Sequence, residues 1–308
     1  MQILLTGGTG FVGSELVKYL STHQIVLLTR DISAAKKKLY HTDLRNITYI
    51  DSLDDYQDFN QFDAIINLAG EPIAGKRWSN KQKKKICQSR WGITEKLVEL
   101  IHASTEPPEV FISGSAVGYY GDQQQHPFDE SLHVYHEGFT HHVCSAWESI
   151  AIKAESDKTR VCMLRTGLVL GLQGGALKAM LPPFQFGMGS VLGKGDQFMP
   201  WIHIQDMVRG IVYLLETPHA KGHFNFNAPH PVTNKHFSRT LARTLRRPLF
   251  MVTPKWLFTL AMGEASCLLF DSIHSKPKRL TELGFHFNYS RLEPALSNLF
   301  HNTNYSIK

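Results

Sequence analysis

The first fourteen residues, Met1-Gln-Ile-Leu-Leu-Thr-Gly-Gly-Thr-Gly-Phe-Val-Gly-Ser14, decide the fold. Residues 3–5 form a short apolar run that is long enough for a buried strand. Gly7, Gly10 and Gly13 follow at intervals of three, and residues 15–20 continue as an amphipathic helix. A strand, a glycine turn and a helix in this order are typical of a dinucleotide-binding unit.

The three glycines have separate tasks in such a unit. One permits the tight turn, one lets a pyrophosphate approach the backbone, and one lets the helix pack on the strand. The helix N-terminus then offers free N–H groups and a partial positive charge to the phosphates. A merely flexible turn would not explain the regular spacing. The sequence therefore predicts cofactor contacts at Gly7, Thr9, Gly10, Phe11, Val12 and Gly13.

Composition limits the class of protein. The chain has 308 residues, of which 43% are apolar, so it can form one large α/β unit or two packed lobes. Its net charge is +6, but the positive residues are scattered, and the densest run, residues 81–85, falls in an expected helix. A small anionic ligand is therefore expected rather than a nucleic acid. The cysteines are far apart and read as reduced thiols: Cys87, Cys144, Cys162 and Cys267.

The sequence shows no signal peptide and no apolar run of membrane length, so we expect a cytoplasmic protein without a membrane partner. Apolar runs alternate with helical patterns, with strands expected at 24–29, 47–50, 62–68, 110–113, 160–164 and 223–227, and helices at 80–102 and 207–217. This rhythm predicts an α/β fold with a doubly wound parallel sheet, the Rossmann arrangement, and a ligand at the carboxyl ends of its strands.

The expected dinucleotide-binding domain covers residues 1–171, with returns at about 201–227, and residues 172–308 form a smaller C-terminal substrate lobe. Residues 174–195 are rich in glycine and proline and are predicted to be mostly loop. Helices expected at 234–245 and 256–269 suit core packing better than cofactor binding. His203 and Asp206 are expected to anchor the returning segment by hydrogen bonds. The tail after Leu299 is polar and is expected to fray.

The end of the second strand decides between NAD(H) and NADP(H). A carboxylate there binds the ribose hydroxyls and repels a 2′-phosphate, whereas an arginine favours the phosphate. Thr29 and Arg30 occupy this place and Asp31 follows, so NADP(H) is the expected cofactor.

For Arg90, a solvated side chain is the alternative to a phosphate or substrate contact. Further cofactor contacts are predicted at Leu68, Ala69, Gly70, Glu71, Arg90, Ser113, Arg165 and Leu168.

These segments resemble the extended short-chain dehydrogenase/reductase superfamily, which includes nucleotide-sugar epimerases and dehydratases. The resemblance is carried by Thr6-Gly-Gly-Thr-Gly-Phe-Val-Gly13, by Asn67-Leu-Ala-Gly70 and by the strand ending in Tyr120-Gly121. Residues 113–121 and 143–148, with the tail around 284–287, further resemble the subgroup called the epimerase family, which has its own short C-terminal domain. The resemblance covers essentially the whole chain. It implies an NADP(H)-dependent epimerase or oxidoreductase acting on a small substrate, with a nucleotide-sugar as one option.

The chain departs from that superfamily at its catalytic pair. Superfamily oxidoreductases use a tyrosine and, four residues later, a lysine that lowers the tyrosine pKa and holds the nicotinamide ribose. Aligned on Trp147-Glu148, this chain has Thr140 and Cys144 at those places, and Ala116 where a serine or threonine is usual. The standard proton relay is therefore absent or rebuilt.

The catalytic residues stay unassigned, with Ser113, Ser115, Tyr119, His141 and His142 as weak candidates. A histidine titrates near neutrality and could serve as acid or base, although most of these histidines also fit solvated positions. No acidic or cysteine ligand pattern accompanies them or their neighbours His133 and His136, so no metal is expected. The rival function is an NADP(H) sensor or protein-interaction module without turnover. Whether the chain forms a homodimer stays open.

Overall fold

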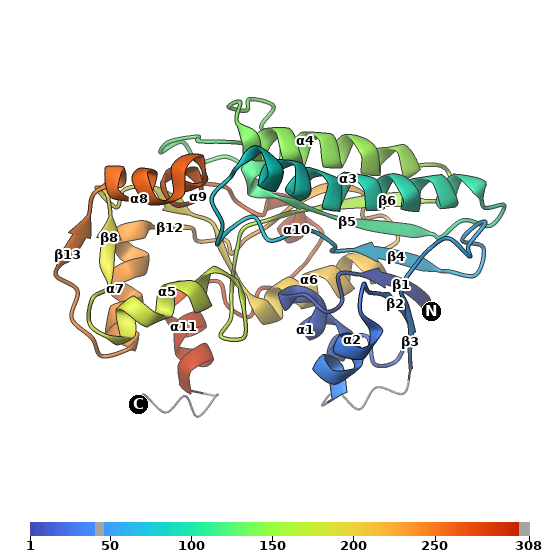
Figure 1. Ribbon diagram of the computed structural model, residues 1–308, viewed down its shortest axis with the longest axis horizontal. Helices are drawn as coiled ribbons and strands as arrows, with labels where there is room; N and C mark the ends of the chain where they lie inside the picture. Colours follow the sequence, from blue (N-terminus) through green and yellow to red (C-terminus); the bar gives the residue numbers. More distant parts are fainter. Residues whose placement is uncertain (41–45, 302–308) are drawn as a thin grey trace.

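The computed structural model describes residues 1–40 and 46–301 and shows a seven-stranded sheet between two layers of helices (Figure 1). The strand order is β11-β6-β5-β4-β1-β2-β3, and every neighbouring pair is parallel. The chain moves outward from β1 in one direction and then returns to build the other half. The doubly wound sheet is therefore confirmed, and its strands are β1 Gln2–Thr6, β2 Gln24–Leu28, β3 Ile47–Ile50, β4 Ala64–Asn67, β5 Val110–Ala116, β6 Arg160–Thr166 and β11 Gly222–Phe226.

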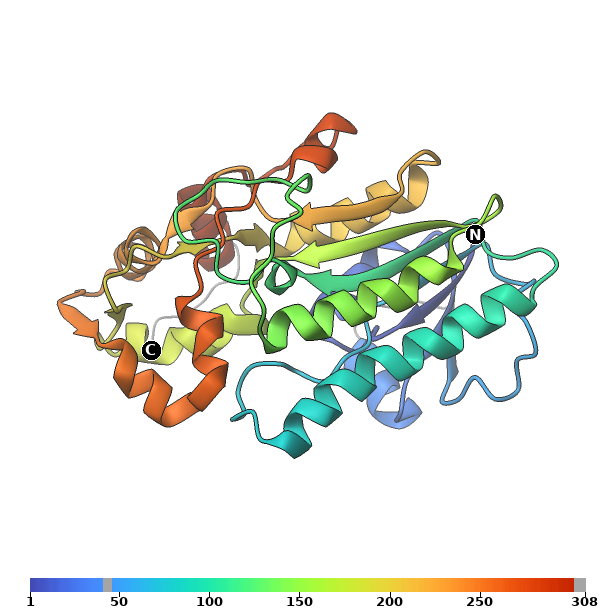
Figure 2. The same ribbon diagram turned by 90° about the horizontal axis from the view of Figure 1, so that it is seen from above.

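Helices cover both faces of the sheet, because alternate side chains of each strand point to opposite sides. Ile112 of β5 belongs to the core under one face, and Phe111 belongs to the core under the other. Helices α1 (Phe11–Tyr19), α2 (Ile32–Leu39) and α6 (Ile204–Glu216) lie on the first face. The long helices α3 (Asn80–Ala103) and α4 (Phe139–Ala151) lie side by side on the second, as Figure 2 shows from above. No helix in the described ranges is both long and apolar enough to cross a membrane.

A smaller lobe lies beyond the carboxyl ends of the sheet strands (Figure 1). It contains three two-stranded ladders, β7–β10, β9–β12 and β8–β13. Its strands are β7 Leu168–Leu170, β8 Ser190–Leu192, β9 Phe198–Met199, β10 Trp201–His203, β12 Val232–Thr233 and β13 Met251–Thr253. Its helices are α5 Gly175–Gln185, α7 Asn234–Thr244, α8 Lys255–Met262, α9 Cys267–Phe270 and α11 Leu292–His301, whereas the short helix α10 Lys278–Glu282 packs against β11 of the sheet. Short 3₁₀ turns occur at Val117–Tyr119, Ile152–Ala154 and Gly263–Ser266.

The returning segment is anchored as the sequence predicts. Asp206 is fully buried, and its carboxylate accepts the backbone N–H groups of Asn288 and Tyr289 at 3.0 and 2.8 Å. His203 caps α6, because its Nδ1 accepts the Gln205 N–H at 3.1 Å. These bonds tie the first turn of α6 to the C-terminal segment, so the lobe and the sheet share one core.

Two predictions for the lobe were wrong. Residues 174–195 contain α5, whose buried Leu177, Leu181 and Phe184 form an apolar stripe that outweighs the prolines at 182 and 183. Residues 256–269 do not form one core-packing helix. Gly263 has φ 62°, which ends α8, and α8 buries none of its residues.

Strand ends also differ from expectation. β5 continues to Ala116 and β6 to Thr166, so the residues expected in the turns after them still pair in the sheet. Of the tail that was expected to fray after Leu299, residues 300–301 belong to α11, and residues 302–308 lie outside the described part of the chain.

Candidate functional site

The three glycines between β1 and the first turns of α1 have different surroundings. Gly7 has φ 71°, and a Cβ placed on it would lie 2.5 Å from the Leu68 carbonyl group. A Cβ on Gly13 would lie 2.2 Å from the Gly7 oxygen, so helix and turn approach too closely for any side chain. At Gly10 the only such neighbour is the Gly7 oxygen, at 3.0 Å. Gly10 therefore faces open space, as a pyrophosphate cradle requires.

The N-terminus of α1 has no side-chain cap. Gly10 is its cap residue, whereas Asp31 and Ser79 accept backbone N–H groups at the starts of α2 and α3. The Phe11 ring packs away from the turn, close to Gly171, Gly174 and Gly175 of the lobe. Val12 packs partly buried against the core. The first N–H groups of α1 thus have no side-chain acceptor and suit a phosphate.

The residues after β2 are those for which the sequence predicts contact with a 2′-phosphate. Arg30 is exposed. The Asp31 carboxylate accepts the Ala34 N–H at 2.8 Å as the cap of α2, and the Thr29 hydroxyl lies 3.4 Å from the Asp31 backbone. The Asp31 carboxylate beside this strand end is therefore engaged in capping α2.

Lys38 is a residue that sequence reasoning missed. It lies in the last turn of α2, and its Nζ donates to the Thr9 carbonyl at 2.6 Å. A second cation therefore stands beside the glycine turn. No local sequence motif predicts this contact, because 29 residues separate Lys38 from Thr9.

The segment after β4 runs along the crevice. Leu68 and Ala69 are half-buried and Gly70 is exposed. Glu71 is buried, and its carboxylate lies 3.0 Å from Lys76 Nζ and 3.2 Å from Lys85 Nζ. The hydrogen bond from Lys76, helped by Gln82 and Lys85, lowers the pKa of Glu71 to about 2. Glu71 therefore stays ionised and bound by protein groups.

A buried polar network occupies the space between β5, β6 and α4. Arg165 donates through Nε and Nη2 to the two oxygens of Glu148, at 2.8 and 2.7 Å. Its Nη1 donates to the Tyr120 hydroxyl at 2.9 Å, and Ser115 Oγ donates to Glu148 at 2.6 Å. Each nitrogen of Arg165 is thus engaged inside the protein. The arrangement does not support the predicted cofactor contact of Arg165.

The remaining predicted positions are less accessible than expected. The Ser113 hydroxyl is fully buried and reaches only the Gly114 carbonyl, at 3.4 Å. Leu168 begins β7 and is half-buried, and its N–H bonds to the Pro200 carbonyl at 2.7 Å. Neither Ser113 nor Ser115 offers a free hydroxyl to a substrate.

The other catalytic candidates lie at the start of α4 and in the turn after β5, and they do not share one flank of the helix. The Tyr119 ring lies 3.6 Å from the Arg165 guanidinium carbon and lines a cavity of about 540 Å³ over β6 and β11. His141 stacks on Tyr135 at 4.0 Å, and its Nδ1 lies 2.5 Å from the Tyr119 carbonyl oxygen. His142 is exposed and meets the edge of Trp91. These rings pack on one another rather than around a common reacting atom.

Comparison with known proteins agrees with this geometry. Residues 3–228 match the NAD dependent epimerase/dehydratase family, and residues 253–299 match a domain of unknown function, DUF1731. An epimerase family protein of Staphylococcus haemolyticus, SH2119, is 38% identical over 97% of this chain and 98% of its own. The chain belongs to the NAD-dependent epimerase/dehydratase family.

Two further relatives of this family member are informative. The chloroplastic SDR39U1 homolog of Arabidopsis thaliana is 37% identical over 96% of this chain and 86% of its own length. The crystal structure of human SDR39U1 (isoform 2), solved with NADPH, is 30% identical and superimposes with a TM-score of 0.88 over 98% of this chain and all of that one. The resemblance stated from the motifs is therefore confirmed, including the separate C-terminal domain.

Thr140 and Cys144, which the motif alignment sets at the places of the tyrosine and lysine, are buried, neutral groups. Thr140 is buried against Gly118, because a Cβ added to Gly118 would lie 3.0 Å from the Cβ of Thr140. Cys144 is also buried, and burial, followed by the nearby Glu148 carboxylate, raises the pKa of its thiol to about 12. Ala116 ends β5 without a hydroxyl. None of the three can exchange a proton near neutrality.

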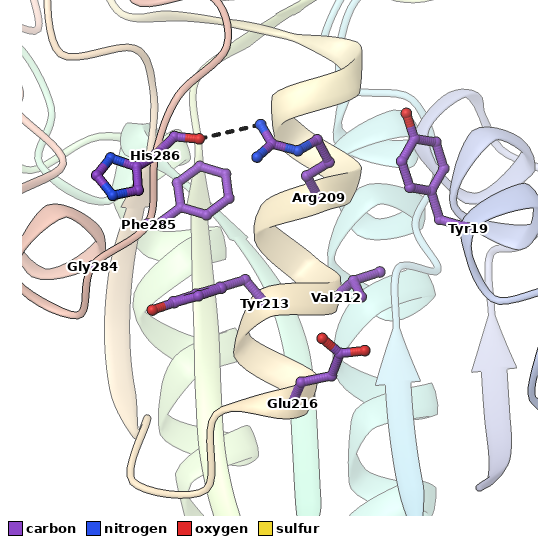
Figure 3. Close-up of a pocket in the computed structure, with 8 residues that line it drawn as sticks. All are labelled: Tyr19, Arg209, Val212, Tyr213, Glu216, Gly284, Phe285 and His286. Carbon is purple, nitrogen blue, oxygen red and sulfur yellow. Dashed lines mark hydrogen bonds between the residues drawn. The ribbon is translucent and has the colours of Figure 1, made fainter.

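A second cavity, of about 290 Å³, lies on the opposite face of the sheet (Figure 3). Arg209 points across it and donates to the His286 carbonyl at 3.2 Å. Tyr19 and Glu216, the last residues of α1 and α6, form its far wall. This cavity is therefore distant from the helix N-termini that suit phosphates, and we do not assign it to the cofactor.

Proposed function

We propose that this family member binds NADP(H) along the carboxyl edge of its sheet. The observation that carries the proposal is the open face of Gly10, where a side chain would stand in the path of a pyrophosphate. The uncapped N-terminus of α1 and the exposed Arg30 fit the phosphates of the same cofactor. The human relative crystallised with NADPH supports the same cofactor. When bound, NADP(H) would supply hydride transfer.

We expect NADPH to bind at least tenfold more tightly than NADH. Arg30 can pair with the 2′-phosphate, and the Asp31 carboxylate is held in the cap of α2. Arg30→Ala should remove most of the preference, which corresponds to about 1.4 kcal/mol for each factor of ten. Calorimetric titration of both proteins with both cofactors measures it. Equal affinities of the wild type for NADPH and NADH would show that Arg30 does not recognise the 2′-phosphate.

We further propose an oxidoreductase or epimerase reaction on a small substrate, with nucleotide-sugars as one class to test. The support is architectural. The lobe formed by α5, α7 and α8 lies beyond the carboxyl ends of the strands, where ligands of such sheets bind. Proton transfer would have to come from a group other than the usual tyrosine.

A second function, NADP(H) binding without turnover, is favoured by one specific observation. Thr140, Cys144 and Ala116 lack the proton-exchanging groups of the standard site, and the polar groups near Cys144, Ser115 and Glu148, are engaged with each other and with Arg165. A sensor would need the cofactor site alone.

We expect NADPH oxidation with nucleotide-sugars and small carbonyl compounds to be undetectable or very slow. Stopped-flow absorbance of bound NADPH measures it. Combining Thr140→Tyr with Cys144→Lys should not create a fast enzyme, because a lysine at 144 would be buried beside Arg90 and Ala116 still lacks a hydroxyl. Rapid turnover by the wild type would retire the sensor hypothesis and show that another group moves the proton.

A further inference from the structure

The far end of the C-terminal lobe exposes a group of large apolar side chains. Strand β13 lies at one end of the long axis of the molecule, away from the seven-stranded sheet (Figure 1). We define the tip patch as six residues that are each more than half exposed: Phe186, Met188, Phe250, Met251, Trp256 and Leu260. Single exposed apolar residues need no explanation, but a group of them marks an interaction surface.

Backbone pairing brings the segments of the tip patch together. β8 and β13 pair in parallel, and a Cβ added to Gly187 would lie 3.5 Å from the Pro248 ring, so residues 186–188 lie beside residues 248–251. Helix α8 begins directly after β13, and Trp256 and Leu260 are four residues apart, which places them on one face of the helix. Within the described ranges β13 pairs with β8 alone, so its outer edge is open.

Four exposed cations flank the tip patch. Arg246 and Arg247 precede β13. Lys194 and Lys255 follow the ends of β8 and β13 by two residues each, and the parallel pairing places them at the same end of the ladder. Residues 235–262 contain six lysines and arginines and no aspartate or glutamate. The patch is therefore bordered by positive charge before and after its exposed strand.

The four flanking cations have no carboxylate partner among the described residues, because none of them takes part in an ion pair there. Cations nearer the sheet are engaged, since Arg165 pairs with Glu148 and Arg90 donates to a main-chain carbonyl of α3 at 3.0 Å. Burial, followed by a nearby carboxylate, raises the pKa of Asp271 to about 6, and Lys255 opposes this shift without forming an ion pair. The tip patch thus offers positive charge to a partner.

Charge decides which partner fits. A second copy of the chain would bring the same cations against one another, which opposes association. An anionic bilayer attracts lysine and arginine and accepts tryptophan, phenylalanine and leucine at the level of its headgroups. We propose that the tip patch docks the protein on an anionic membrane surface, with Phe250 and Trp256 in the interface and the four cations at the lipid phosphates. The proposal does not depend on the NADP(H) site.

The sequence predicted no membrane partner for a reason that does not apply to this surface. That prediction was drawn from the lack of an apolar run of membrane length, which concerns spanning helices rather than contact with one face of a bilayer. The residues of the tip patch come from three short segments, 186–188, 250–251 and 256–260. Only folding brings these segments together.

Vesicle binding tests the proposal with the intact protein. At low salt the wild type should sediment with vesicles of equal parts phosphatidylglycerol and phosphatidylcholine, and much less with phosphatidylcholine alone. Combining Arg246→Gln with Arg247→Gln should weaken partitioning into the anionic vesicles roughly 30-fold, or about 2 kcal/mol for the two cations. Combining Lys36→Gln with Lys37→Gln on α2 is the matched control. It makes the same charge change at two exposed positions away from the lobe and should bind nearly as the wild type does.

Tryptophan emission locates the contact. Trp256 is exposed, whereas Trp78, Trp147 and Trp201 are buried and Trp91 is half-buried. Anionic vesicles should shift the wild-type emission to shorter wavelength, and Trp256→Phe should lose this shift while still sedimenting with the vesicles.

Four results would overturn the proposal. They are no binding to anionic vesicles, equal binding to both kinds of vesicle, binding without a shift from Trp256, and a lipid-free dimer in analytical ultracentrifugation that Trp256→Ser dissociates. The last result would show that a second copy covers the tip patch.

Discussion

The Gly10→Val variant is expected to lose NADPH binding by at least about 100-fold, or about 2.7 kcal/mol, and to remain folded. Valine would fill the open face of the turn, where the pyrophosphate must approach the backbone. The fold should tolerate it, because Gly10 has φ −72° and ψ 179°, which suit a β-branched residue. Its Cβ would have only the Gly7 oxygen nearby, at 3.0 Å. Calorimetric titration and thermal denaturation measure the two effects.

Gly13→Val is the matched control. Its Cβ would lie 2.2 Å from the Gly7 oxygen and 2.6 Å from the Gly8 Cα, both of them main-chain atoms that cannot move independently. This variant should therefore lose stability as well as binding. If Gly10→Val still bound NADPH tightly, the phosphates would be held elsewhere and the assignment of the glycine turn would be wrong.

The parts of the site that sequence could predict are those that depend on near neighbours. Gly7, Gly10 and Gly13 fall within one turn, and their roles follow from how strand, turn and helix must meet. Arg30 lies two residues after the end of β2, so its place at the carboxyl edge of the sheet follows from the strand boundary. The parallel sheet followed in the same way from the regular alternation of apolar runs and helices.

Contacts between distant segments could not be predicted in this way. Glu148 pairs with Arg165 and Ser115, which are 17 and 33 residues away. The hydroxyl of Ser115 and the guanidinium of Arg165 are polar groups on strands, and sequence alone suggested catalysis for Ser115 and a cofactor contact for Arg165. In the folded protein both groups donate hydrogen bonds to the same buried carboxylate, that of Glu148.

The lobe shows a different reason for failure. Apolar residues at helical spacing in α8 predict burial, yet Trp256 and Leu260 are 65% and 70% exposed. Periodicity reports that a helix has an apolar face, but not whether another element covers it. In α5 the reverse happened, because its two prolines concealed an apolar stripe that is buried.

The second large effect concerns stability rather than binding. Glu148→Gln should lower the free energy of unfolding by about 3–5 kcal/mol, as for a buried ion pair that loses one partner. Burial alone would lower the pKa of Arg165, but the Glu148 carboxylate raises it above its usual range, so the pair is held together as ions. Without the carboxylate, the Arg165 side chain, 3% exposed, would keep an unmatched charge. Urea denaturation followed by circular dichroism measures the loss.

The double variant Glu148→Leu with Arg165→Met distinguishes an unmatched charge from lost packing. The double variant contains no buried charge. It should therefore be more stable than the single variant Glu148→Leu, in which the Arg165 charge has no partner. Ser115 would lose its acceptor, which limits the recovery, because an unsatisfied buried group costs about 1–3 kcal/mol, whereas the Tyr120 hydroxyl would still donate to Asn225. If the two single losses simply added in the double variant, the residues would not be coupled, and the network would not be what fixes α4 against β5 and β6.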